Sequence, residues 1–62
     1  MGTKLKEARQ EARLTQEQLA EKAKVSRSTI VALENNTLAD VMASTLVKIA
    51  QALGKTVSEL FF

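Results

Sequence analysis

The stretch TQEQLAEKAKVSRSTIVALENN, residues 15–36, decides the fold, because it predicts two short helices joined by a sharp turn. Thr15 and Gln18 have the spacing of a capping box, in which each side chain bonds the backbone N–H of the other residue. Ser26 is a second N-cap residue shortly after Lys24, so the first helix has to end near that lysine. The apolar side of this first helix consists of Leu19, Ala20 and Ala23.

The second helix of the stretch has two faces of different character. On a helical wheel its inner face holds Thr29, Ile30 and Leu33. Its outer face holds Arg27, Ser28, Val31, Ala32 and Asn35. A helix of about ten residues is too short to be stable in isolation. We therefore expect the inner face to pack against the rest of the chain and the outer face to remain available to a partner.

The flanking segments predict three more helices. The first helix of the chain is expected over about residues 4–13. A fourth helix is expected from residue 43 or 44 to residue 53, where Gly54 ends it. A fifth follows the capping box formed by Thr56 and Glu59. The result is one compact all-α domain of five helices over residues 1–62.

Apolar residues at helical spacing mark the side of each flanking helix that should face the core. These positions are Leu5, Ala8 and Ala12 in the first helix, Leu46, Ile49, Ala50 and Leu53 in the fourth, and Val57, Leu60 and Phe61 in the fifth. We expect Leu60 and Phe61 to cover the core. Phe62 is the better candidate for a contact between subunits.

Composition limits the classes of function. With 62 residues the chain has room for one domain. Cysteine and histidine are both absent, which removes disulfides, thiolate metal sites and the commonest general base. Two glutamate pairs, Glu7 with Glu11 and Glu17 with Glu21, fall on predicted outer faces without a nucleophile nearby, as solvated surface residues do. We therefore expect no enzymatic activity, no metal and no cofactor.

The net charge of +2 is distributed unevenly. Residues 1–27 hold seven Lys or Arg against four Glu, a balance of +3, and residues 28–62 hold two Lys against three acidic residues, a balance of −1. A basic half is compatible with a polyanionic partner, although ordinary surfaces show similar imbalances. No apolar run is long enough for a secretory signal or a membrane span. We expect a cytoplasmic protein without a small-molecule ligand.

Arg9 lies at the edge of the apolar stripe of the first helix, where an unpaired guanidinium would be costly. Glu34 lies at the border between the two faces of the second motif helix and is the natural partner. We predict an ion pair that ties the first helix of the chain to the third. The alternative is that both are solvated surface charges.

The order and spacing of these residues resemble the helix-turn-helix domain of lambdoid phage repressors and xenobiotic-response-element (XRE) regulators. The motif residues that carry the resemblance are Thr15, Gln16, Leu19, Ala20, Val25, Ser26, Ile30, Leu33, Glu34 and Asn35. Further matches are Arg9 and Leu14 upstream, and Leu46, Ile49, Ala50, Leu53, Gly54, Glu59, Leu60 and Phe61 downstream. The resemblance implies a lambda-repressor-like fold with its motif at about residues 16–35. It also implies a transcriptional regulator of double-stranded DNA, acting as a dimeric repressor, and an ion pair between Arg9 and Glu34.

The resemblance assigns roles within the motif, because the second helix of such motifs enters the major groove while the first crosses the DNA backbone. The expected base contacts are Arg27, Ser28, Val31 and Ala32. Gln16 resembles a position that holds a phosphate in the family. The other expected phosphate contacts are Thr15, Ser26, Asn35 and Asn36, each of which is by itself more typical of a cap or a turn. Arg27 suits guanine best, with a phosphate or solvent as alternatives. Val31 and Ala32 suit thymine methyl groups, a tolerated apolar surface or a protein-binding patch equally well.

The sequence departs from the usual pattern of the family at its turns. Glycine is usual where Arg13, Lys24 and Asn36 stand. A left-handed backbone at a residue other than glycine costs roughly 1–2 kcal/mol, and asparagine tolerates it best. The expected loop over residues 37–41 contains no basic residue and includes Asp40. That composition weakens the case for phosphate contacts from the loop.

Two other functions fit the sequence. A repressor-like interaction module, of the antitoxin or adaptor type, would use the outer face of the second motif helix to bind a protein. An engineered stable variant would have the fold without a natural operator. Binding to DNA weakens steeply as salt is added, because phosphate neutralisation releases counterions. A protein interface built on apolar side chains is much less sensitive to salt.

Overall fold

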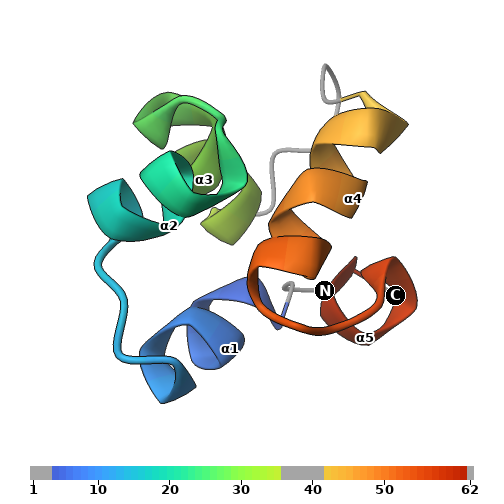
Figure 1. Ribbon diagram of the computed structural model, residues 1–62, viewed down its shortest axis with the longest axis horizontal. Coiled ribbons are helices and arrows are strands. Elements are labelled where there is room, and N and C mark those ends of the chain that lie inside the picture. The colour runs from blue at the N-terminus through green and yellow to red at the C-terminus, as the bar shows by residue number, and fades with distance from the viewer. Residues whose placement is uncertain (1–3, 36–41, 62) are drawn as a thin grey trace.

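The computed structural model describes residues 4–35 and 42–61, in which the chain forms five α-helices and no strand. They are α1 (Leu5–Glu11), α2 (Gln16–Ala23), α3 (Arg27–Glu34), α4 (Ala43–Ala52) and α5 (Val57–Phe61). α2 packs against α3 and α4, α5 packs against α4 and α1, and α1 packs against α3 (Figure 1). The predicted five-helix all-α class is confirmed. The expectations for Asn36, for the loop over residues 37–41 and for Phe62 lie outside the described residues.

The core draws apolar side chains from every helix. The large side chains with essentially no exposed surface are Leu5, Leu19, Ile30, Leu33, Ile49 and Leu60. Burying each of them contributes roughly 1.5–3 kcal/mol relative to leaving it exposed. Leu60 and Phe61 are both buried, as predicted for residues that cover the core. The expectation for Ala12 is wrong, because this residue is exposed.

Local hydrogen bonds explain why α2, α3 and α5 begin where they do. Thr15 Oγ1 accepts from the N–H of Gln18 at 3.0 Å, and the N–H of Thr15 donates to Gln18 Oε1 at 2.9 Å. Ser26 Oγ accepts from the N–H of Thr29 at 3.2 Å. Thr56 and Glu59 repeat the reciprocal pattern at 3.1 and 2.9 Å. The predicted caps of α2, α3 and α5 are therefore present, and the cap at Ser26 fixes where the turn between α2 and α3 ends.

α1, α2 and α4 end in the same way, with a left-handed residue that folds the chain back over the last turn. Arg13 has φ 59° after α1, Lys24 has φ 59° after α2, and Gly54 has φ 67° after α4. In each case the next N–H reaches back to a carbonyl of the helix, as the 3.1 Å bond from Leu14 N–H to the Arg9 carbonyl shows. The left-handed Arg13 ends α1 at Glu11 rather than near residue 13. Ala12 keeps a right-handed backbone, with φ −79°, but it lies at the exposed end of the helix, where the chain turns away.

Replacing Arg13 or Lys24 by glycine should raise the free energy of unfolding by up to about 1 kcal/mol each, because glycine adopts positive φ without a Cβ clash. The gain stays below the full strain, since glycine also increases the entropy of the unfolded chain. Thermal melts would measure the change. Arg13→Ala and Lys24→Ala are the controls, because alanine removes the long side chain but keeps the strain. Unchanged melting temperatures for both glycine variants would mean that the strain at these turns is no larger than the entropic cost of glycine.

Glu59 makes the stability of the domain depend on pH. The hydrogen bond from the backbone N–H of Thr56, followed by the Thr56 hydroxyl, lowers the pKa of Glu59 below its ordinary value of 4.5. A carboxyl whose pKa is lower in the folded state stabilises the fold above its unfolded pKa, and this contribution is lost as the pH falls through the lowered pKa. Glu59→Gln keeps the capping box but removes the titration. Below about pH 4.5 the melting temperature of the wild type should therefore fall relative to that of the variant; parallel pH profiles would contradict this.

The start of α1 is bonded to the end of α5. The backbone N–H of Lys4 donates to the carbonyl of Leu60 at 2.8 Å, so the first and last described segments of the chain lie together (Figure 1). Within residues 4–35 and 42–61, no helix has both the length and the apolar character that crossing a membrane requires.

Candidate nucleic-acid interface

Four side chains of α3 gather on the face that turns away from the core. Arg27, Ser28, Val31 and Ala32 line one open depression of the surface. They occupy two adjacent rows of the helix, because residues four apart lie one above the other. The first two are exposed and the other two are half-buried. On the opposite side of α3, Ile30 and Leu33 have no exposed surface. The predicted division of this helix into an inner and an outer face is confirmed.

Arg27 belongs to a second depression as well, together with Thr15, Gln16 and Glu17 at the start of α2. The first turn of a helix carries backbone N–H groups without helical partners, and these give that end a positive partial charge. The side chain of Arg27 therefore connects the outer face of α3 with the end of α2 that favours anions. These two depressions share Arg27 and together form one surface of mixed polar and apolar character.

The orientation of α3 is set by the carboxylate of Glu34, its last residue. Arg9 of α1 donates to this carboxylate through Nε at 2.6 Å and through Nη2 at 3.3 Å. Gln16 of α2 donates to the same group through Nε2 at 3.1 Å. Arg9 also donates through Nη1 to the Leu14 carbonyl at 2.7 Å. The Glu34 carboxylate thus holds α1, α2 and α3 at fixed angles.

The ion pair is largely withdrawn from solvent, with the side chain of Arg9 12% exposed and that of Glu34 4% exposed. It is the pair that the sequence predicted, and the solvated alternative does not apply. Of the groups within residues 4–35 and 42–61, no buried side-chain nitrogen or oxygen lacks a hydrogen-bond partner. Because the charges are paired and bonded, their burial does not leave an isolated charge, which would destabilise the fold.

Gln16 has a second role that the sequence did not indicate. Its side-chain nitrogen is bonded to Glu34, so the amide group points a donor at the ion pair. This nitrogen carries a second N–H, which the bond to Glu34 leaves available. The backbone N–H of Gln16, in the first turn of α2, is a further donor. The phosphate contact expected from Gln16 is therefore compatible with its bond to Glu34.

The other expected phosphate contacts lie on caps and turns. The hydroxyl of Thr15 caps α2, and the hydroxyl of Ser26 caps α3 while also bonding Thr29 Oγ1 at 2.8 Å. Asn35 directly follows α3, is exposed, and has φ −90°. Asn36 lies outside the described residues.

Comparison with protein families shows which family the chain belongs to. The sequence profile described as helix-turn-helix matches residues 5–60. The chain belongs to the helix-turn-helix family. The resemblance to XRE regulators and lambda repressors is thereby confirmed. At the level of the family, this match supports DNA binding and the regulation of transcription.

Solved structures contain the same arrangement of helices. Apo-HppE is 26% identical to this helix-turn-helix protein with a TM-score of 0.80 over 94% of the chain, which corresponds to 32% of HppE. Hydroxypropylphosphonic acid epoxidase from S. wedmorenis gives the same identity and TM-score, with 30% of its length covered. The chain thus spans about a third of these proteins. No curated protein matches the sequence.

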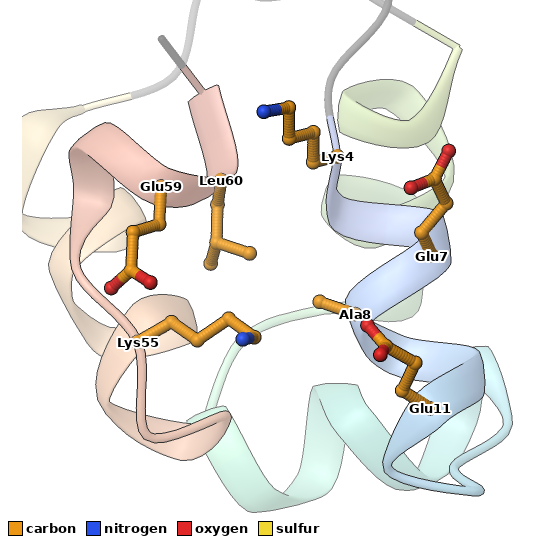
Figure 2. A pocket seen from close by; sticks show the side chains of 7 residues that line it. All are labelled: Lys4, Glu7, Ala8, Glu11, Lys55, Glu59 and Leu60. Carbon is orange, nitrogen blue, oxygen red and sulfur yellow. The ribbon is translucent and has the colours of Figure 1, made fainter.

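Two further hollows of the helix-turn-helix domain lie away from the outer face of α3. One lies between α1 and the start of α5 and is lined by Lys4, Glu7, Ala8 and Glu11 on one side and by Lys55, Glu59 and Leu60 on the other, as Figure 2 shows. The other is lined by Lys22, Lys24 and Lys48 with Ala23, Gln51 and Ala52. Across residues 4–35 and 42–61, the acidic side chains form no cluster that could hold a metal ion.

Proposed function

We propose that this protein binds a specific sequence of double-stranded DNA and represses transcription by covering a promoter. The observation that carries the proposal is the arrangement of α3. Its inner side is fixed by Ile30, Leu33 and the Glu34 ion pair, while Arg27, Ser28, Val31 and Ala32 share the outer depression. An α-helix with a rigid back and a mixed polar and apolar front fits the major groove.

The outer side chains of α3 suit particular base edges. The guanidinium of Arg27 can donate two hydrogen bonds to O6 and N7 of guanine, the commonest specific contact in the major groove. Ser28 can bond a base or a phosphate oxygen. The methyl groups of Val31 and Ala32 lie about one helical turn further along and suit thymine methyl groups. The half-site should therefore combine a guanine with neighbouring thymines.

Phosphate contacts would come from the start of α2. The backbone N–H groups of Gln16 and its neighbours offer donors and a positive partial charge to one phosphate group. Thr15 and Asn35 have exposed positions from which to add contacts. Such contacts position the domain without reading sequence.

The protein should act as a symmetric homodimer. A single recognition helix reads only a few base pairs, so specificity in a genome requires two half-sites about one helical turn, roughly 34 Å, apart. We further propose that it has no catalytic role, because the outer face offers donors and methyl groups rather than a nucleophile and a base. The chemistry of the much longer HppE proteins is not carried over to this chain.

Selection of binding sites from a random DNA library tests the proposal most directly. An enriched motif with two inverted halves would support dimeric, sequence-specific binding, and an unenriched pool would contradict it. Affinity for the selected site should also fall steeply with salt. The interaction module would be favoured instead by two results together. The protein would bind no DNA at low salt, and it would bind a protein partner with an affinity that does not change with salt.

A further inference from the structure

Glu17 occupies an unusual position for a surface carboxylate. It is exposed and lies in the first turn of α2. It lines the same depression as Thr15, Gln16 and Arg27. The sequence alone groups it with Glu21 as a solvated pair, yet Glu21 does not line that depression. The fold brings Glu17 to the surface where α2 and α3 meet.

The carboxylate of Glu17 is not neutralised by a side chain. Within residues 4–35 and 42–61, Arg9 and Glu34 form an ion pair with a nitrogen–oxygen distance below 4.0 Å, whereas Glu17 forms no such pair. Arg27 is exposed and lines the same depression without reaching Glu17 at ion-pair distance. The negative charge of Glu17 therefore acts on whatever enters this depression. It also interacts favourably with the positive end of α2.

We propose that Glu17 limits the affinity of this domain for DNA. The inference rests on the proposed function, in which a phosphate group meets the backbone N–H groups at the start of α2. That phosphate and the Glu17 carboxylate are both anions drawn to the same helix end and to the same guanidinium. Two like charges at short range in water repel one another, so Glu17 weakens binding to every DNA sequence. Such a sequence-independent repulsion lowers the affinity for the operator and for random DNA by the same factor, so the ratio of the two affinities is unchanged.

The test compares Glu17→Gln with Glu21→Gln, which removes the same charge one helical turn away on the same helix. Affinities are measured by fluorescence anisotropy at low salt on the selected operator and on a short duplex of mixed sequence. Glu17→Gln should bind both duplexes roughly threefold to tenfold more tightly than the wild type. Glu21→Gln should change affinity much less. The advantage of Glu17→Gln should shrink as salt is added, because exposed charges are screened.

Thermal melts provide a second readout. Glu17→Gln removes a charge that favours the start of α2, so its melting temperature should not rise while its affinity for DNA does. Tighter binding with unchanged or slightly lower stability separates an effect at the interface from a better-folded protein.

Each alternative result has a definite meaning. Equal affinities for wild type and Glu17→Gln, or equal gains for Glu17→Gln and Glu21→Gln, would overturn the inference while leaving the proposed function intact. A loss confined to one base pair would also overturn it, because Glu17 would then be accepting a bond from cytosine. If the wild type binds no duplex but Glu17→Gln does, the inference stands. If neither binds, the proposed function and the inference both fail.

Discussion

Replacing Arg9 by alanine should lower the free energy of unfolding by about 2–4 kcal/mol, because it leaves the carboxylate of Glu34 buried without a charged partner. For a domain of this size such a loss corresponds to a fall in melting temperature of roughly 10–25 °C. The geometry of the pair supports a large effect. Arg9 Nε lies 2.6 Å from Glu34 Oε2, and the Glu34 side chain is only 4% exposed. Thermal and urea denaturation of the variant would measure it.

Two further variants separate the ion pair from the general loss of a side chain. Lys6→Ala removes an exposed cation from the same helix and should change stability by no more than about 0.5 kcal/mol. Arg9→Lys keeps the charge but lacks the planar group that bonds both carboxylate oxygens and the Leu14 carbonyl. It should fall between the wild type and Arg9→Ala. If Arg9→Ala melted together with Lys6→Ala, the pair would contribute nothing to stability.

Replacing Arg27 by alanine should weaken binding to the selected operator by roughly tenfold to a hundredfold, the discrimination expected of one bidentate contact with guanine. Stability should change little, because the Arg27 side chain is exposed and outside the core. Binding to the operator and to each of its single base-pair variants would be measured. The loss should be largest on the operator and should vanish on sites where one particular G·C pair has been changed.

The pattern of loss identifies what Arg27 contacts. Equal weakening on every sequence, with a shallower salt dependence, would mean that it holds a phosphate. Arg13→Ala is the control, because it removes an exposed arginine that lines neither of the two depressions. Affinities of Arg27→Ala that match those of Arg13→Ala on all sites would place Arg27 outside the interface.

The starts of α2, α3 and α5 could be predicted from sequence because the capping bonds that form them are local. A capping box joins residues three apart, so Thr15 with Gln18 and Thr56 with Glu59 can be recognised without knowing the fold. The end of α1 could not be predicted in the same way. It depends on Arg13 adopting a left-handed conformation that its residue type does not favour.

Some features of the candidate interface could likewise be predicted from local sequence, and others depend on how the helices pack. The two faces of α3 follow from helical periodicity alone, and the ion pair between Arg9 and Glu34 follows from the need to neutralise a charge near the core. The bond between Gln16 and Glu34 joins residues 18 positions apart and depends on the angle between α2 and α3. The shared depression of Glu17 and Arg27 depends on that angle as well. Such relations appear only once the helices are packed.

The hydrogen bond from the backbone N–H of Lys4 to the carbonyl of Leu60, 2.8 Å long, holds the first and last described segments of the domain side by side. Domains with neighbouring ends tolerate being spliced into a surface loop of a host protein, or being closed into a ring and reopened elsewhere. A host protein could therefore accept this domain as an insertion between two of its own residues. Its backbone on either side of the insertion would hardly have to move.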